Sequence, residues 1–230
     1  MFGFPKKKCL KWGYFPSTIE TDTPAYTSYE RFGHSQGKLL FSAQRLLPLK
    51  RVDLQIQAVH CLKREGIDAY LCIAGDGPDR QRLEHLAANL NVEESVEFLG
   101  ELAHSEILAL MRQSGIFLAT SDRNEGWGAT INEAMAMGSC VIACEEMGSV
   151  PYLIENNSTG LVFKNELSEL VSQIKIAMEN PALAAKYGKN AKHALENNWN
   201  AHVAAERLYY FACFADSRVD KFEIGPLSAS

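Results

Sequence analysis

The sequence lacks the features that mark several large classes of protein. It has no apolar run approaching the roughly 20 residues that a membrane-spanning helix needs, and its first residues are too weakly apolar for a signal peptide. It also has no basic excess, because 23 lysines and arginines stand against 28 aspartates and glutamates, for a net charge of −5. Proteins that bind nucleic acid usually show such an excess, so we expect no nucleic-acid partner.

The sequence also lacks cysteines and histidines at the spacings that are typical of a metal site. The six cysteines are scattered, mostly within apolar segments, and Cys140 and Cys144 are too far apart along one predicted strand to chelate an ion together. Such cysteines are typical of buried thiols in a reducing compartment. The histidines fall among polar residues, where a structural role is the usual one. We therefore expect no metal site and a cytoplasmic location.

What the sequence does contain is a globular composition and a regular alternation of patterns. Of its 230 residues, 47% are hydrophobic and 22% are charged, as in ordinary globular proteins. Short apolar segments alternate with helical patterns, which predicts an α/β fold with a Rossmann-like, doubly wound parallel sheet and a helical C-terminal segment. The expected strands are Leu39–Ala43, Ala69–Ala74, Val96–Leu99, Ile116–Ala119, Cys140–Cys144 and Gly160–Phe163.

The pattern also divides the chain. We expect residues 1–37 to form a linker or surface segment, residues 38–214 to form the domain, and residues 215–230 to form a loose tail with little apolar content. Within the first of these, the stretch Trp12-Gly13-Tyr14-Phe15-Pro16 is too aromatic for a free tail. We expect it to pack on this domain or on a neighbour.

The residues suited to chemistry are concentrated in Thr120–Ala143, which is predicted to contain a loop, a helix from about Trp127 to Met137, and a strand. Glu125 lies in the loop and Glu133 lies inside the helix. A carboxylate accepts two hydrogen bonds side by side, which suits the vicinal diol of a ribose or hexose. The alternative is a capping carboxylate and an exposed helix glutamate.

The start of this helix favours an anion between those two carboxylates. Gly126 and Gly128 flank it and let a ligand approach the backbone, and the free N–H groups of a helix start attract anions such as a diphosphate. A diphosphate between two hydroxyl-bearing groups describes a nucleotide sugar.

Further candidates follow the other strands, at the ends where open α/β sheets bind ligands. Arg45 and Lys50 follow the first strand and are suited to gripping phosphate, although surface charges are the alternative. Gly75 and Gly77 follow the second strand, but Arg80 occupies the place of the third glycine of a dinucleotide fingerprint. The incomplete fingerprint disfavours an NAD-dependent oxidoreductase.

The segment EGWGATINEAMAMGSCVIA resembles the donor-site signature of retaining glycosyltransferases of the GT-B fold, family 4: Glu, seven residues, Glu, then Ala-Met-x-x-Gly and a strand. The resemblance covers residues 39–214 and implies the C-terminal, nucleotide-sugar-binding half of such an enzyme. It implies that Glu125 contacts the transferred sugar and Glu133 the ribose hydroxyls. It also implies that Arg45 and Lys50 bind the donor diphosphate.

The resemblance implies weaker contacts too. Leu99 and Leu102 lie at a turn similar to the one whose backbone meets the nucleotide base, and Ser139 matches a minor nucleotide contact. Trp127 either shapes the sugar pocket or packs into the core. The expected catalytic residues are Glu125, Arg45 and Lys50, and the expected binding residues are Glu133, Gly126, Trp127, Gly128, Leu99, Leu102 and Ser139.

The resemblance implies retaining transfer of a hexosyl unit from a UDP- or GDP-linked donor to a hydroxyl acceptor, with no cofactor and no metal. The segment Gly-Ser-Val-Pro-Tyr at 148–152 is similar to a branch that builds bacterial surface polysaccharides, which implies a lipid-linked acceptor and a peripheral position at the inner membrane face. A missing N-terminal domain or subunit would carry the acceptor site. The alternative is a non-catalytic nucleotide-sugar-binding module or partner subunit.

Overall fold

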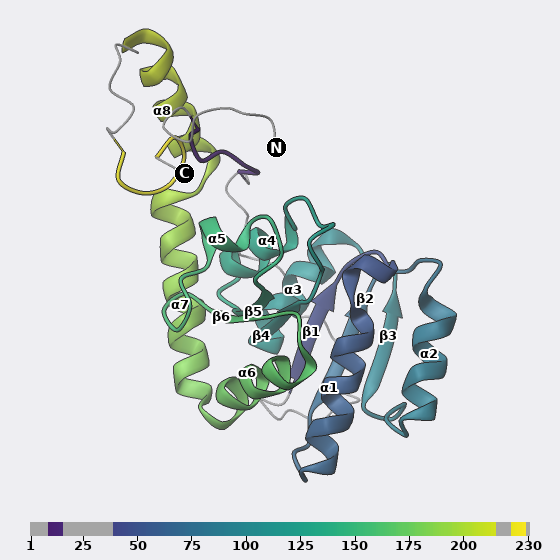
Figure 1. Cartoon of the computed structure of the whole chain (residues 1–230). Helices are drawn as coiled ribbons and strands as arrows, with labels where there is room; N and C mark the ends of the chain where they lie inside the picture. Colours follow the sequence, from purple (N-terminus) through teal and green to yellow (C-terminus); the bar gives the residue numbers. More distant parts are fainter. Residues whose placement is uncertain (1–8, 16–38, 215–221, 229–230) are drawn as a thin grey trace.

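The structure, a computed structural model, describes residues 9–15, 39–214 and 222–228. Its centre is a six-stranded sheet with the strand order β3-β2-β1-β4-β5-β6, in which every pair is parallel (Figure 1). This confirms the expected doubly wound sheet. The strands are β1 (Leu39–Ala43), β2 (Tyr70–Ala74), β3 (Val96–Gly100), β4 (Ile116–Ala119), β5 (Cys140–Cys144) and β6 (Leu161–Phe163).

Helices cover both faces of the sheet, which explains why the strands read as continuous apolar runs. Strands β1, β4 and β5 are buried along their whole length, and Phe41 and Phe117 contact edge to face between β1 and β4, with ring centroids 6.0 Å apart. One face carries α1 (Val52–Arg64), α2 (Arg80–Asn89) and α6 (Leu167–Glu179), and the other carries α3 (His104–Ser114), α4 (Thr130–Ala136) and α7 (Pro181–Asn198).

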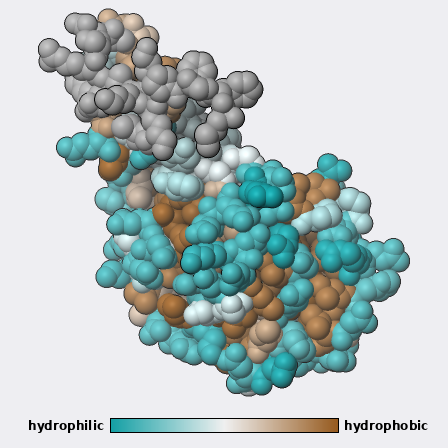
Figure 2. Space-filling view, in the orientation of Figure 1, coloured by the Kyte–Doolittle hydropathy of each residue, from teal (hydrophilic) through white to brown (hydrophobic). Residues whose placement is uncertain are grey.

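The outer faces of α1, α2 and α6 are largely hydrophilic, with apolar side chains scattered among polar ones (Figure 2). This is the surface that amphipathic helices present when their apolar stripe faces a core. Within the described part of the chain, no helix has both the length and the apolar character needed to cross a bilayer.

Three short features differ from the sequence-based expectation. Helix α4 begins at Thr130, later than the expected start near Trp127, because Gly128 has a φ of +81° and interrupts the helical path. The 3-10 helix η3 (Pro48–Lys50) and the one-turn helix α5 (Val150–Leu153) were not predicted. Elements of one turn are too short to show a hydrophobic period.

The aromatic stretch near the start of the chain packs against the end of α7, as expected for residues 12–15. The indole N–H of Trp199 donates a hydrogen bond to the backbone oxygen of Tyr14 at 3.1 Å. The ring of Phe15 lies 5.1 Å from the ring of Trp199, measured between centroids. Pro16 lies outside the described residues.

Part of the expected loose tail is held in place. Within it, the structure describes residues 222–228, where Leu227 and Ser228 are buried. Lys11 N donates to Ser228 O at 2.9 Å, and Leu227 N donates to Lys11 O at 2.8 Å. These backbone bonds need little apolar content, which is why composition did not reveal them. The boundaries of linker, domain and tail themselves stay a prediction.

Helix α8 (Ala201–Phe214) projects beyond the body of the molecule (Figure 1). Its Leu208 and Tyr209 side chains are 47% and 70% exposed. The apolar face of this last helix is thus partly uncovered.

The close packing of the loops after β1 and β2, at the carboxyl edge of the sheet, can be tested by substituting glycine in the turn after β2. Gly75 has a φ of +116°, and a Cβ there would lie 2.0 Å from the backbone oxygen of Gln44. Gly66 has a φ of +76° with nothing within 4 Å of its Cβ position, so Gly66→Ala should lose only about 1 kcal/mol of unfolding free energy through backbone strain. Gly75→Ala should lose at least about 2 kcal/mol more, because the two loops must separate.

Urea unfolding of both variants measures this difference. Equal losses for Gly66→Ala and Gly75→Ala would contradict the close approach of the two loops.

Candidate functional site

The loops that follow β1 and β4 meet at the carboxyl edge of the sheet. The ammonium of Lys50 and the carboxylate of Glu125 form an ion pair, with side chains only 19% and 16% exposed. Asp122 N also donates to Leu49 O at 2.9 Å. Two of the expected catalytic residues, 75 positions apart in the chain, are therefore in direct contact.

The third expected catalytic residue, Arg45, lies in the same loop as Lys50 but is engaged differently. It stands two residues after the end of β1, and its side chain is exposed. Among the described residues, its guanidinium has no hydrogen-bond or ion-pair partner. It is therefore available to a ligand anion, whereas Lys50 must exchange its present partner.

The loop after β2 supports the loop after β1 from the other side. Leu46 N donates to Asp76 O at 2.9 Å, and Gly75 N donates to Gly100 O at 2.6 Å. A Cβ at Gly77 would lie 2.3 Å from the backbone oxygen of Leu46. These glycines let neighbouring loops pack closely. They do not form the first phosphate-binding turn of a dinucleotide fold, which would follow β1.

Glu133 has a different environment from Glu125. It lies in the first turn of α4 and is half-buried, and among the described residues its carboxylate accepts no hydrogen bond. Burial raises the pKa of Glu133, and the nearby His104 opposes this shift. A desolvated carboxylate that accepts no hydrogen bond from the described residues is a candidate for contact with a ligand.

His104 was not singled out from the sequence, because a lone histidine among polar residues carries little signal. It begins α3, shortly after β3 ends. The only clue in the sequence to a role for His104 was its position shortly after the predicted third strand. The same loop holds Leu102, and Leu99 lies at the end of β3; both leucines are half-buried at the carboxyl edge.

The start of α4 offers less to an anion than expected. The helix has only 7 residues, and Ile131 N already donates to Gly128 O at 3.0 Å. A Cβ at Gly126 would meet nothing within 4 Å, so this part of the backbone is open. The charge of a bound diphosphate would therefore be balanced mainly by Arg45 and Lys50.

Of the two expectations for Trp127, packing is the one its contacts support. Its ring stacks at 5.7 Å from both Trp199 and Tyr152, and its indole N–H donates to the Asn132 side-chain oxygen at 2.9 Å. A Cβ at Gly13 would lie 2.2 Å from the ring. The indole is enclosed by protein on several sides.

Ser139 does not fit the expected nucleotide contact. It precedes β5, so it lies at the amino edge of the parallel sheet, opposite the other candidates. Its side chain is 1% exposed, and its hydroxyl donates to Met111 O at 2.6 Å. Between Glu133 and Ser139, helix α4 carries the chain along one face of the sheet from its carboxyl edge back to its amino edge.

Unpaired polar atoms gather around the carboxyl edge. Among the described residues, the buried side-chain atoms without a partner are Gln44 Nε2, Asn132 Nδ2, Ser149 Oγ and Gln173 Oε1. The first three belong to residues just after β1, in α4, and after β5. Each such atom costs about 1–3 kcal/mol, so their concentration here indicates a site that a ligand or water completes.

The cysteines take no part in this site. The six are free thiols, and burial raises the pKa of Cys72 and Cys140 to about 12 and that of Cys144 to about 11. These three thiols stay protonated at neutral pH. The described residues also bring together no group of three or more His, Cys, Asp or Glu side chains suited to a metal ion.

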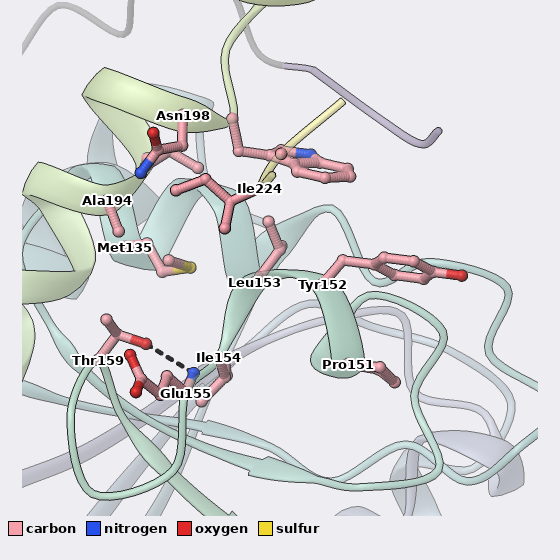
Figure 3. A pocket seen from close by; sticks show the side chains of 13 residues that line it. Met135, Pro151, Tyr152, Leu153, Ile154, Glu155, Thr159, Ala194, Asn198 and Ile224 are labelled. Atoms are coloured by element: carbon pink, nitrogen blue, oxygen red, sulfur yellow. Dashed lines mark hydrogen bonds between the residues drawn. The ribbon is translucent and has the colours of Figure 1, made fainter. Parts of the chain in front are cut away.

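A separate cavity of about 340 Å³ lies between α4, α5 and α7 (Figure 3). Its lining is mostly apolar, with Met135 and Leu153 pointing inward, and a hydrogen bond from Glu155 N to Thr159 Oγ1 of 2.9 Å at one end. The described residues that line it include no lysine or arginine. It therefore suits a diphosphate poorly, and none of the expected site residues belongs to it.

Comparison with known proteins assigns the family. The family described as "Glycosyl transferases group 1" matches residues 30–194, which is more than half of the chain. The chain belongs to this glycosyltransferase family.

Relatives and solved structures agree with that assignment. The chain is 28% identical over 180 residues to alpha-D-kanosaminyltransferase of Streptomyces kanamyceticus, covering 78% of this chain and 46% of that protein. It is 26% identical over 185 residues to a GDP-mannose-dependent alpha-(1-6)-phosphatidylinositol monomannoside mannosyltransferase of Mycolicibacterium smegmatis, covering 78% and 48%.

The fold is also that of HepE (Alr3699) from Anabaena, whose crystal structure contains UDP. The TM-score is 0.70 at 21% identity, over 80% of this chain and 51% of HepE. This chain thus spans about half the length of each of these three proteins, and its sheet and helices are similar to those of GT-B glycosyltransferases.

The raised pKa of Glu133 predicts a change in stability without any ligand. Between the ordinary pKa of 4.5 and the raised value, the folded state binds more protons than the unfolded state, so stability falls as pH rises through that window. Glu133→Gln removes the desolvated charge. We expect the ligand-free variant to melt at a higher temperature than the wild type at pH 7, with the difference shrinking as pH falls toward 4.5.

Differential scanning calorimetry from pH 4 to pH 8 is the measurement. Glu101→Gln, exposed at the same edge, is the control and should leave the melting temperature unchanged. A lower melting temperature for Glu133→Gln at pH 7 would mean that the carboxylate supports the fold.

Proposed function

We propose that this chain is the donor-binding half of a retaining glycosyltransferase of family 4, which binds a nucleotide diphosphate sugar at the carboxyl ends of β1 and β4. The contact between Lys50 and Glu125 carries the proposal. It places a cation suited to phosphate beside a carboxylate suited to sugar hydroxyls, at the point where the strand order reverses. Arg45, exposed in the same loop, supplies a second positive charge.

Each residue then has a defined role. As the bond between the anomeric carbon and the diphosphate breaks, Arg45 and Lys50 stabilise the negative charge that develops on the departing diphosphate. These cations act where a metal ion acts in other transferases, so the proposal requires no metal and no further cofactor. Glu133 accepts hydrogen bonds from the ribose, and the backbone near Leu99 and Leu102 receives the base.

Donor binding requires Lys50 to change partners. Its ammonium leaves Glu125 for a phosphate oxygen, and the released carboxylate accepts hydrogen bonds from the hexose hydroxyls. Both side chains are mostly buried, so breaking this pair would be costly if either charge were left without a partner. The exchange avoids that cost, because the ammonium gains a phosphate oxygen and the carboxylate gains sugar hydroxyls.

The acceptor site belongs, in this proposal, to an N-terminal domain or subunit facing the same crevice. The half-length match to the relatives and the exposed apolar side chains of α8 support it. We propose that the acceptor is a hydroxyl of a growing polysaccharide or glycolipid, used at the cytoplasmic face of a membrane. The mannosyltransferase of M. smegmatis, whose name includes phosphatidylinositol, supports a lipid-linked acceptor.

The first test is nucleotide binding without metal. At about 100 times its Kd, UDP or GDP should raise the unfolding free energy by about 2.7 kcal/mol, in EDTA as well as in Mg²⁺, while NADH produces no shift. Lys50→Met should weaken binding about tenfold, because a charge-assisted hydrogen bond is lost. Lys63→Met is the control, since Lys63 lies at the far end of α1 and donates to Asn91 O.

Thermal melting with each ligand gives the shifts. Strict dependence on Mg²⁺ or Mn²⁺, or a stabilisation by NADH and not by UDP or GDP, would rule out the site as proposed.

The second test separates the two carboxylates by calorimetric titration. Glu133→Gln should weaken both the free nucleotide and the nucleotide sugar, by roughly 1.5–3 kcal/mol, because both ligands contain ribose. Glu125→Gln should weaken only the nucleotide sugar, because the free nucleotide has no hexose. It should not weaken UDP or GDP, since the substitution frees Lys50. Equal losses of both ligands in both variants would show that the carboxylates merely support the loop and helix.

A further inference from the structure

Three fully buried side chains form a continuous hydrogen-bonded chain beneath Lys50. Ser42 Oγ donates to Gln55 Oε1 at 2.8 Å, and Gln55 Nε2 donates to Thr120 Oγ1 at 2.7 Å. Thr120 Oγ1 in turn donates to the backbone oxygen of Lys50 at 2.9 Å. The three side chains are each 0% exposed. They come from β1, from α1 and from the residue just after β4, so they join the segments that meet at the candidate site.

The direction of every bond in this chain is fixed by its last member. A backbone oxygen can only accept, so the Thr120 hydroxyl must donate its proton to Lys50 and can only accept from Gln55. The amide N–H of Gln55 therefore faces Thr120, and its oxygen faces Ser42. The chain has a single arrangement, which is the property that lets a buried polar network specify a geometry.

The packing of the core does not require the polar side chains of Ser42, Gln55 and Thr120. The neighbours of Gln55 on α1, Leu54 and Ile56, are buried and apolar, and a buried amide or hydroxyl is costly unless it is hydrogen-bonded. An apolar residue at position 55 would fill the same space without that cost. The network therefore calls for an explanation other than stability.

The turn that carries Lys50 is held by the adjacent Arg51, whose guanidinium donates to Asn165 Oδ1 at 2.9 Å, and by bonds from the loop after β4 to its backbone. Helix η3 has no side-chain cap, and the next residue, Arg51, has a φ of 51°, in the left-handed region. Lys50 N donates to Leu47 O at 2.9 Å within the same turn. Between this turn and the loop after β4, the backbone contacts of the described residues are the Thr120 bond to Lys50 and the Asp122 bond to Leu49.

We propose that Thr120 and Gln55 are positioning residues of the donor site, which hold the backbone of Lys50 so that its ammonium faces the diphosphate. The inference rests on the proposed role of Lys50 in donor binding. Neither residue touches the ligand. Their effect is on the part of the ligand that Lys50 contacts, the diphosphate, and not on the nucleoside.

The test compares Thr120→Val, Thr120→Ser and Ser114→Ala. Valine matches threonine in shape but lacks the hydroxyl, and serine keeps it. Ser114 is a matched control, because its buried hydroxyl also donates to a backbone oxygen, that of Met111 at 3.2 Å, at the amino edge of the sheet. Calorimetry with UDP and uridine, and with GDP and guanosine, reports the diphosphate and nucleoside contributions separately.

Thr120→Val should bind the nucleoside diphosphate about tenfold more weakly, as for the loss of one buried hydrogen bond, and the nucleoside as well as the wild type does. Thr120→Ser should restore wild-type affinity, and Ser114→Ala should bind both ligands normally. Unchanged diphosphate affinity in Thr120→Val, or an equal loss for the nucleoside, overturns the inference. If Thr120→Val does not fold, Gln55→Met takes its place in the test. We expect this variant to lose affinity for the nucleoside diphosphate but not for the nucleoside.

A second measurement needs no ligand. The coupling between Lys50 and Glu125 is obtained from a double-mutant cycle of Lys50→Met and Glu125→Gln in urea unfolding. It should be present in the wild-type background and absent in the Thr120→Val and Gln55→Met backgrounds. If the wild type binds no nucleotide, the proposed function fails, and this cycle still decides the positioning role. Equal coupling in all backgrounds would overturn that role.

Discussion

The candidate site depends on the reversal of strand order between β1 and β4. The loop after β1 leads to α1 on one face of the sheet, and the loop after β4 leads to α4 on the other (Figure 1). Neighbouring loops that depart in opposite directions leave a crevice between them. The ion pair of Lys50 and Glu125 spans that crevice, so the residues suited to a diphosphate and to a sugar are placed by topology rather than by sequence proximity.

The edge of the sheet combines a rigid support with groups that lack partners. Glycines after β2 let the loops approach to distances that no side chain would allow, and the Ser42–Gln55–Thr120 chain fixes the turn of Lys50 from below. Above this support, Arg45 is exposed, and Glu133 is desolvated and accepts no hydrogen bond from any residue that the structure describes. The contacts that stabilise the fold thus lie below the site. The groups whose burial or lack of a partner lowers the folding free energy gain are the ones that would contact a ligand.

The sequence predicted the sheet well because its strands are buried on both faces. Strands β1, β4 and β5 have the expected bounds, since a fully buried parallel strand is an apolar run with sharp ends. The start of α4 was predicted too early, because one glycine with positive φ interrupts a continuous helical pattern. The segment 222–228 was missed as an ordered element, because its backbone bonds to the start of the chain leave no trace in composition.

For the site, the sequence suggested candidate residues but not how they pair. The contact between Lys50 and Glu125 joins residues 75 positions apart, and no local pattern encodes it. The family resemblance implied a nucleotide contact for Ser139, but this residue is buried at the amino edge of the sheet. His104, Gln55 and Thr120 carried no motif, and their relevance appeared only when burial and hydrogen bonds were known. The family to which the chain belongs and its fold were both accessible from the pattern of strands and from one signature.

The most direct measurement of the central claim is a crystal structure of this chain soaked with UDP or GDP. The account predicts the diphosphate at the carboxyl ends of β1 and β4, with Lys50 Nζ and the Arg45 guanidinium bonded to phosphate oxygens and the ribose hydroxyls on Glu133. Lys50 should have left Glu125. A nucleotide bound elsewhere, in the apolar cavity beside α7 or with Lys50 and Glu125 still paired and no cation on the phosphates, would contradict it.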